Sequence, residues 1–433
     1  MYGLNVAELR KNLVGRIGPL GFARLLTLGT PSLLMFFLFW AAGSAEAGRF
    51  YVFFTTALLA SMIADLGIGN AFPLLFGPPG GNAHPLLPPI LRFRLALAFL
   101  FAVGLALTGG VGYFRFSGAG EACFTGLFVF LRVFLASHQG FHYAREDFYI
   151  LLRGAVLHAS LVVIGFLPIL FNPSWGALLG LFLLCLGSIA EFLVLDTPQA
   201  RPLGKLNTSA SGTASALNTV SLPQTDSPGL FSFLAPFIFV GISGAMYTRG
   251  DALIMGMCLS PYNAGIWGTL QAGFRLAIFP AYLSGQAVYP SLNTAAAEGD
   301  GLSFRRHTGL HFRTSIVFMA PFLVGGFTVL PFVPSGIVGL HEAIALLLLC
   351  LPLSVTNSLI SPVFFSRRRE KEVARLSILF GGARLPLGFI LASSFGIVGM
   401  ALLQLFFDIL HFLIYGLLLI KGPPEAKEKT EKS

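Results

Sequence analysis

The sequence has 433 residues, of which 55% are hydrophobic and only 11% are charged, and its formal net charge is +9. A soluble domain carries about 25% charged residues, so this composition excludes a single water-soluble core and predicts an integral membrane protein. In such a protein the excess positive charge is expected on a surface that faces anionic membrane lipid, and we expect no nucleic-acid partner.

Twelve apolar segments are long enough to span a bilayer as helices. We predict an all-α, polytopic membrane protein with 12 transmembrane helices in two lobes of six, residues 1–195 and 230–420. A Ser/Thr/Pro-rich stretch, residues 196–229, reads as a flexible linker between them, and residues 421–433 form a polar tail. The predicted spans are Leu20–Ala42, Phe50–Phe76, Leu95–Phe114, Ala122–Gly140, Phe148–Phe171, Trp175–Leu195, Phe231–Leu259, Ala264–Leu292, Thr314–Leu340, Ala343–Phe365, Val373–Ser394 and Ile397–Ile420.

The distribution of lysine and arginine predicts how these spans are oriented. Of the 28 Lys and Arg residues, only Arg49 and Arg115 fall in the odd-numbered loops, and most others lie at the termini, in the linker and in the even-numbered loops. Because cytoplasmic loops carry an excess of Lys and Arg, both termini and the linker are predicted to be cytoplasmic. The arginines within the predicted spans are Arg24, Arg132, Arg153, Arg249, Arg275 and Arg384.

The two halves of the chain share a gap-free similarity. Ala47–Leu75 aligns with Ala264–Leu292 with eight identical residues in 29, among them Gly48 with Gly265. The match pairs the second predicted helix with the eighth, as a six-plus-six duplication requires, and the two helices run in the same direction. We therefore predict pseudo-symmetric lobes related by an axis along the membrane normal, an arrangement suited to alternating access.

Ionisable side chains inside a membrane are expensive, and each one is a candidate functional residue. Arg24, Arg153 and Glu191 lie near the cytoplasmic ends of their spans, where long side chains can snorkel to the interface. Arg384 and Asp408 lie on adjacent predicted helices at similar depth, which predicts a structural ion pair.

Other charges are predicted deeper in the spans. Arg132, Asp65 and Arg275 lie near mid-span, and the helices of the last two are interrupted by Gly and Pro, so both are candidates to line a central pathway. Arg249 and Asp251 belong to an Arg-Gly-Asp tripeptide inside a predicted helix. They are two residues apart, about 200° around the helix, so each needs a separate partner or water.

Two stretches together resemble a known family: residues 64–77, ADLGIGNAFPLLFG, and residues 248–292, which begin TRGDALIMGMCLSPYNAGIW. An acid is followed by an aliphatic–Gly run, a Ser-Pro loop, a Gly–aromatic stretch and an apolar–Pro end. In this pattern the chain is similar to the polysaccharide (O-antigen type) flippases of the multidrug/oligosaccharidyl-lipid/polysaccharide exporter superfamily. The residues that carry the resemblance are Asp251, Leu253–Gly256, Ser260, Pro261, Gly265–Trp267, Tyr289 and Pro290.

This resemblance implies a MATE-like fold, with two lobes around a central cavity, in the cytoplasmic membrane of a bacterium. It implies a transporter and not an enzyme. The substrate would be a lipid-linked glycan, an undecaprenyl-pyrophosphate-linked oligosaccharide, which alternating access turns from the inner to the outer leaflet. Glycan polymerases or other assembly proteins would be its protein partners.

A pyrophosphate headgroup is anionic, and a guanidinium group binds phosphate oxygens bidentately. Asp65 and Asp251 would balance the positive charges or carry a coupling H⁺ or Na⁺, and no other cofactor and no metal site is expected. The resemblance makes Arg249 and Arg275 the leading substrate-binding residues, followed by Arg24 and Arg132.

Three other functions stay open. A cation-coupled multidrug antiporter of the same superfamily would have the same fold, but such proteins typically carry a carboxylate in the first helix, where this chain has Arg24 and no acid. A membrane enzyme that polymerises or ligates glycans usually needs a sizeable outward loop with acid–base residues, and every predicted outward loop is short. An assembly protein without transport activity is the third.

Overall fold

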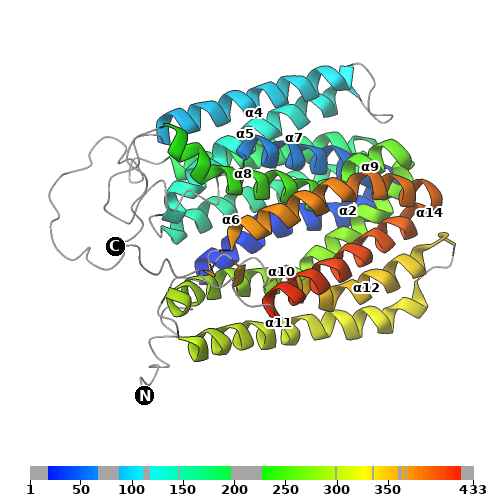
Figure 1. Cartoon of the computed structure of the whole chain (residues 1–433). Coiled ribbons are helices and arrows are strands. Elements are labelled where there is room, and N and C mark those ends of the chain that lie inside the picture. Colours follow the sequence, from blue (N-terminus) through cyan, green and yellow to red (C-terminus); the bar gives the residue numbers. More distant parts are fainter. Residues whose placement is uncertain are drawn as a thin grey trace, which may run out of the picture. The chain divides into compact units, whose positions relative to one another are not determined.

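Helices make up most of the described structure (Figure 1). No β-strand occurs among the described residues, so the predicted all-α class is confirmed. Eight of the described helices are long and apolar enough to cross a membrane, as a multi-pass membrane protein requires. The structure is a computed structural model that describes residues 18–66, 87–110, 118–144, 147–196, 227–297, 300–333, 336–358, 363–364, 366–367 and 369–420.

Two of these candidate spans are long enough to cross a bilayer twice. They lie in α2 (Gly18–Asp65) and α14 (Glu370–Ile420) and contain 45 and 47 residues. That is about 70 Å of helix, against a hydrocarbon core of about 30 Å. Gly43 (φ 86°, ψ 170°) interrupts α2 and Gly396 (φ 58°, ψ −132°) interrupts α14, because only glycine adopts such angles without strain. The interruptions fall where the sequence separates predicted helices 1 and 2, and 11 and 12, although the total of twelve stays a prediction.

The chain divides into two compact units, Met1–Thr269 and Leu270–Ser433, and the division lies within α10 (Pro261–Ala297). Most of the predicted linker and all of the predicted tail lie outside the described residues, so the predicted domain limits stay a prediction. The other elements of the first unit are α4 (Leu87–Gly110), α5 (Ala119–Ala144), α6 (Phe148–Gly165), η3 (Leu167–Leu170), η4 (Pro173–Trp175), α7 (Gly176–Leu195), α8 (Ser227–Arg249) and α9 (Asp251–Cys258). Those of the second are α11 (Gly301–Val329), η6 (Leu330–Phe332), α12 (Leu340–Asn357) and α14.

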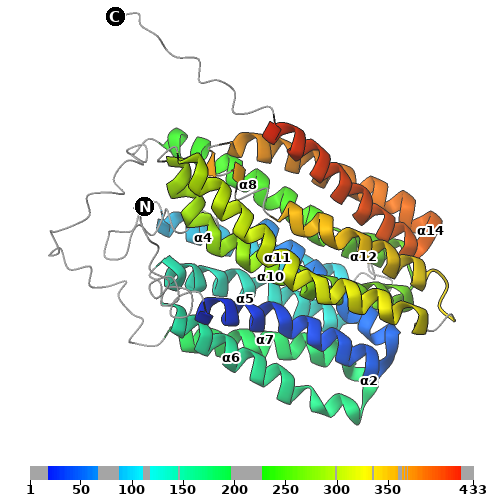
Figure 2. The same cartoon turned by 90° about the horizontal axis from the view of Figure 1, so that it is seen from below.

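Helices pack in neighbouring pairs within each unit. In the first unit α4 packs along α5 (Figure 1) and α6 along α7, and α2 contacts both pairs (Figure 2). In the second unit α12 packs against α11 and α14. A buried apolar cluster joins α2, α5, α6 and α7 in the first unit, and it consists of Ala23, Leu135, Leu151, Ala155 and Leu195.

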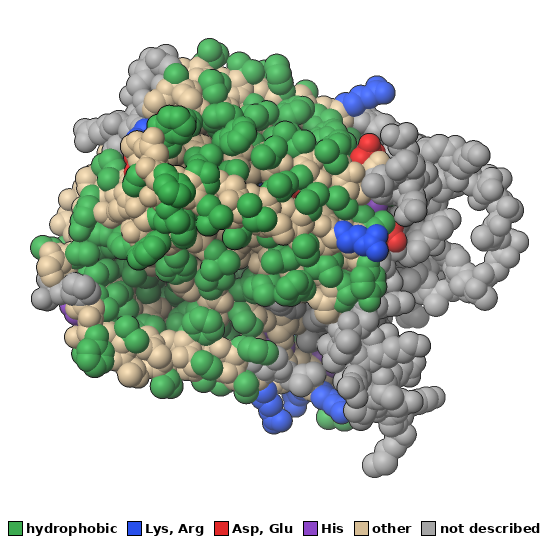
Figure 3. All heavy atoms as spheres, turned by 180° about the vertical axis from the view of Figure 1, so that it is seen from behind, with side chains coloured by type: hydrophobic (Ala, Val, Ile, Leu, Met, Phe, Trp, Pro, Cys, Tyr) green, Lys and Arg blue, Asp and Glu red, His purple; other side chains and the backbone are tan. Residues whose placement is uncertain are grey.

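Many large hydrophobic side chains are exposed, as a lipid environment allows. Hydrophobic side chains are spread over the face shown in Figure 3, and the charged side chains of that face lie toward its edges. Trp40 on α2 is 75% exposed and Val324 on α11 is 69% exposed. Lipid acyl chains can cover these apolar side chains, whereas their contact with water would be unfavourable.

Two glycines that are equivalent in the internal repeat lie where two helices of the first unit cross closely. A Cβ atom on Gly48 of α2 would lie 1.8 Å from the carbonyl oxygen of Pro261, and one on Gly265 of α10 would lie 1.8 Å from that of Ser44. Gly48 aligns with Gly265 in the repeat, and the same register relates Ser44 to Pro261. The two contacts are therefore equivalent under a local two-fold axis. Small residues allow such a close approach of helix backbones.

One predicted helix limit is wrong and a second is only partly described, and each concerns a charged residue. α4 begins at Leu87, before the predicted Leu95, so Arg94 lies inside a helix and not in a loop. α2 ends at Asp65, because Leu66 has a φ of 53°, which a helix does not accommodate. Asp65 is therefore the last residue of α2. Its predicted mid-span depth stays a prediction, because residues 67–76 of the predicted second span lie outside the described residues.

Candidate functional site

A polar cluster lies inside the first unit among α5, α6 and α7. Glu191 on α7 is only 1% exposed, and its Oε1 accepts a hydrogen bond from Nε2 of Gln139 on α5 at 2.6 Å. Its Oε2 lies 3.2 Å from Nδ1 of His158 on α6, which is also buried. The side chain of Glu191 passes over Gly154, where a Cβ would lie 3.0 Å from Glu191 Cγ. The expectation that Glu191 snorkels is therefore wrong, because its carboxylate points into the unit.

Two of the predicted substrate-binding arginines lie at this cluster. Arg24 comes from the first half of α2, and Arg132 comes from α5, seven residues before Gln139 and so on the same side of that helix. Both side chains are half-buried, and Arg132 is within electrostatic range of Glu191 and Arg24. Neither guanidinium group forms a hydrogen bond or contact ion pair within the described part of the chain.

The charges of this cluster do not cancel. Two guanidinium groups stand against one carboxylate, whose oxygens contact Gln139 and His158 rather than either arginine. The apolar cluster of α2, α5, α6 and α7 includes Ala23, next to Arg24, and Leu135, between Arg132 and Gln139 along the chain. Because electrostatic interactions are strong in such a poorly polarisable surrounding, the net positive charge favours an anion.

Asp65 has an arginine partner of its own. It forms an ion pair with Nη2 of Arg94 on α4, whose side chain is fully buried. Nη1 of Arg94 also donates to Oγ of Ser137 on α5 at 3.0 Å. These contacts join the end of α2 to α4 and α5. This arrangement explains how the charge of Arg94 is accommodated inside the unit. The role of Asp65 in transport stays a prediction.

Arg249 and Asp251 lie where α8 meets α9. Gly250 between them keeps helical angles (φ −59°, ψ −22°), and its N–H donates to the carbonyl of Met246 at 2.9 Å. Asp251 is 2% exposed, whereas Arg249 is half-buried. Both side chains have interaction partners. Their position at a helix junction agrees with the predicted helical setting, and their predicted roles are untested.

The remaining predicted residues belong to the second unit. Arg275 on α10 is half-buried and has an interaction partner. Arg384 and Asp408 lie on the two halves of α14, and Gln404 lies between them: Arg384 Nη2 donates to Gln404 Oε1 at 2.7 Å, and Gln404 Nε2 donates to Asp408 Oδ2 at 2.9 Å. Oγ of Ser354 on α12 donates to the same carboxylate oxygen at 2.5 Å. The two charges predicted to pair are thus connected through a buried amide.

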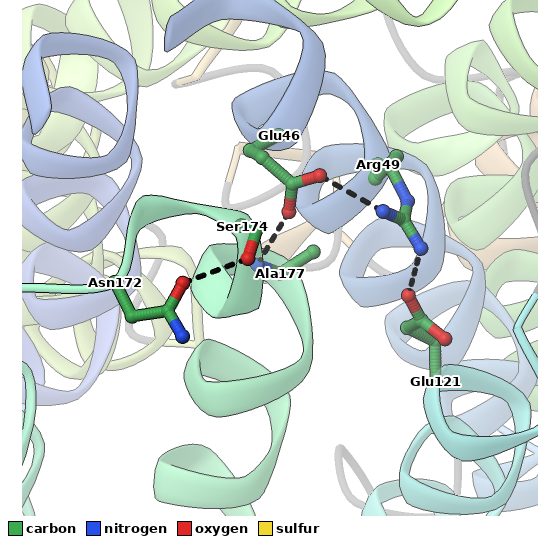
Figure 4. A network of polar contacts seen from close by, with 6 residues as sticks. All are labelled: Glu46, Arg49, Glu121, Asn172, Ser174 and Ala177. Carbon is green, nitrogen blue, oxygen red and sulfur yellow. Dashed lines mark hydrogen bonds and ion pairs between the residues drawn. The ribbon is translucent and has the colours of Figure 1, made fainter. Parts of the chain in front are cut away.

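A second charged network holds three helices of the first unit together (Figure 4). Arg49 on α2 donates to Glu46 at 2.8 Å and forms an ion pair with Glu121 at the start of α5. Oε2 of Glu46 accepts a hydrogen bond from the backbone N–H of Ala177, in the first turn of α7, at 3.1 Å. A carboxylate is favourable at a helix N-terminus, so we interpret this network as structural.

No group of three or more His, Cys, Asp and Glu side chains that could hold a metal ion occurs within the described ranges. The residues that sequence reasoning missed are mostly neutral. Gln139, His158 and Gln404 carry no charge pattern that marks them, and only the seven-residue spacing of Arg132 and Gln139 could have indicated a shared helix face.

The comparisons with known proteins give the fold. No protein-family model matches the chain, and no curated protein is significantly similar to it in sequence. The MATE multidrug transporter DinF-BH, solved in a ligand complex, is similar over 97% of both chains with a TM-score of 0.66 and 16% identity. An inward-facing multidrug resistance MATE transporter of the MOP superfamily is similar over 92% of this chain and 95% of that one, with a TM-score of 0.62 and 12% identity.

A third structure with this fold is a MOP superfamily transporter from Pyrococcus furiosus, described as having a binding pocket of reversed polarity that suggests a different function. Its TM-score is 0.58 at 13% identity, over 94% of this chain and 95% of that one. Together these similarities define the class: a multi-pass membrane protein with the MATE transporter fold. At such low identities they establish the fold, and function has to be argued from the site.

Proposed function

We propose that this chain is a transporter that moves an undecaprenyl-pyrophosphate-linked oligosaccharide across the cytoplasmic membrane of a bacterium by alternating access. The observation that carries the proposal is the charge of the buried cluster, in which Arg24 and Arg132 stand against the single carboxylate of Glu191. The fold shared with MATE structures supports a transporter rather than an enzyme.

The chemistry of the substrate fits this cluster. A lipid pyrophosphate carries several acidic oxygens in a small volume, and guanidinium groups bind such oxygens through paired hydrogen bonds with little desolvation cost. In the proposal, Arg249 and Arg275 are further headgroup contacts and Asp251 balances their charge. Asp65 is better suited to charge balance than to ion coupling, because Arg94 already holds it. Anionic lipid and glycan-assembly proteins are the proposed partners.

The second candidate is a cation-coupled multidrug antiporter, which the MATE transporters of similar fold favour. Binding of an organic cation needs negative charge in the site. In α2 before Gly43, Arg24 is the only charged side chain, and the cluster around it is positive. The reversed pocket polarity described for the Pyrococcus furiosus transporter supports the view that this fold is not tied to cationic substrates. We therefore favour an anionic substrate.

A reconstituted flipping assay tests the proposal. Proteoliposomes would hold a fluorescent undecaprenyl-pyrophosphate oligosaccharide, and the appearance of label in the opposite leaflet would be followed over time. Arg132→Gln should reduce the apparent affinity about tenfold to a hundredfold, because a charge-assisted hydrogen bond contributes about 1.5–3 kcal/mol. Arg153→Gln is the matched control, since Arg153 is an exposed arginine on α6. Transport of a fluorescent organic cation without any lipid flipping would establish the antiporter instead.

A further inference from the structure

The buried cluster contains a second ionisable group beside the carboxylate. We infer that Glu191 and His158 form a proton-binding site that controls how strongly Arg132 attracts an anion, an inference that rests on the proposed function. Both side chains are more than nine-tenths buried, and Glu191 Oε2 lies 3.2 Å from His158 Nδ1. Neither Asp65 nor Asp251, the carboxylates expected to balance charge or to carry a coupling ion, is part of this site.

The geometry fixes what a proton can do there. One oxygen of Glu191 is occupied by the Gln139 amide, which donates to it at 2.6 Å, so the second oxygen and the imidazole nitrogen are where a proton binds. Within the described residues His158 Nδ1 makes no hydrogen bond, and its contact with Glu191 is an ion pair only if the imidazole is protonated. The pair can therefore gain or lose a proton while its two side chains stay in contact.

Other charged and titratable groups surround the pair from each neighbouring helix. α2 contributes Arg24, and α5 contributes Arg132. His138 on α5 packs edge-on against Phe192, and the α5 residue His142 contacts the carbonyl of Leu195 at 3.0 Å and Asp147 at 3.5 Å. On α6, Arg153 is exposed. Among the described residues, Glu191 contacts Gln139 and His158, and it interacts electrostatically with Arg132, which in turn interacts with Arg24.

Uptake of one proton raises the local charge by one, whichever of the two groups accepts it. If Glu191 is protonated, its negative charge is lost; if His158 is protonated, a positive charge is added. In both cases less negative charge offsets Arg132, so an anion binds more tightly. By linkage, a bound anion must raise the proton affinity of the pair by the same factor. Anion binding and proton uptake therefore favour one another.

Calorimetry on the full chain tests this coupling. Farnesyl pyrophosphate and inorganic pyrophosphate are titrated into the protein between pH 8 and pH 5, in buffers of different ionisation enthalpy, which counts the protons taken up. The wild-type protein should take up protons as it binds the anion, at most one per anion and with at most about a tenfold gain in affinity per pH unit for one coupled site. Glu191→Gln should bind the anion more tightly than the wild type at pH 8, and should take up fewer protons on binding.

Controls separate this inference from the proposed function. Glu121→Gln removes a different buried carboxylate from an arginine ion pair and should keep the wild-type proton uptake. His158→Asn, a second variant, should also lose uptake if Glu191→Gln does not fold. If Glu191→Gln takes up as many protons as the wild type, the proton site is refuted while anion binding stands. If neither pyrophosphate binds to the wild type at any pH, the proposed function fails first. A direct acid–base titration of both proteins without ligand then tests the proton site. Glu191→Gln should bind one proton fewer than the wild type, and equal proton binding would refute the site.

Discussion

The crossing of α2 and α10 gives a prediction that depends only on backbone geometry. Gly48→Ala would place a Cβ atom 1.8 Å from the carbonyl oxygen of Pro261 and 2.7 Å from the nitrogen of Gly265. To reach even 3.0 Å, the shortest distance that real Cβ atoms show, the two helices must separate by about 1.2 Å; ordinary contact at 3.4 Å needs about 1.6 Å. Overpacking of this kind costs about 1–3 kcal/mol.

A matched control lies on the same helix. A Cβ atom on Gly29 would have no neighbouring heavy atom within 4 Å, so Gly29→Ala should gain about 0.5–1 kcal/mol from helix propensity alone. Gly48→Ala and Gly29→Ala should therefore shift the thermal unfolding temperature in opposite directions. Trp267 is fully buried on α10 two residues beyond Gly265, so its fluorescence reports on the crossing.

The double variant sharpens the test. Because one separation of the helices relieves both contacts, Gly48→Ala with Gly265→Ala should destabilise the protein by less than the sum of the single effects. If Gly48→Ala is as stable as Gly29→Ala, or if the two glycine substitutions are additive, the helices do not meet at these glycines and the reasoning is refuted.

Two further predictions concern buried charges. Asp65→Asn leaves Arg94 buried without its carboxylate and should destabilise the protein by about 3–5 kcal/mol, while the double substitution with Arg94→Met should recover much of the loss in thermal unfolding. Gln404→Leu removes the amide that connects Arg384 to Asp408 and should lower stability by about 1–3 kcal/mol; an unchanged melting temperature would show that the amide is dispensable.

Long apolar runs made the fold largely predictable. The breaks at Gly43 and Gly396 fall in the gaps between predicted spans, at residues that tolerate positive φ. Helix ends were less predictable, since α4 continues before the apolar run begins and includes Arg94. Arg94 is accommodated inside this helix because Asp65 at the end of α2 forms an ion pair with it.

The site was less predictable than the fold. Sequence position gives the depth of a residue along a helix, but not which neighbour it faces. Glu191 lies near a helix end and was expected to reach the interface, yet Gln139 and His158 hold it inside. The charges considered within the predicted spans did not include glutamine or histidine. Nothing in the charge pattern therefore indicated that Gln139 and His158 contact a carboxylate. Arg24 and Arg132, by contrast, are marked by their charge within predicted spans, although their substrate-binding role comes from the family resemblance and stays a prediction.

The backbone contacts between Gly48 and Pro261 and between Gly265 and Ser44 also bear on how such a chain can evolve. In a symmetric dimer of six-helix subunits, a single glycine would make both contacts across the two-fold axis, and one mutation would damage both at once. Once two such subunits are fused into one chain, each contact depends on a different codon. The two halves can then diverge in sequence. At the crossing, however, each half must keep its own glycine, Gly48 or Gly265.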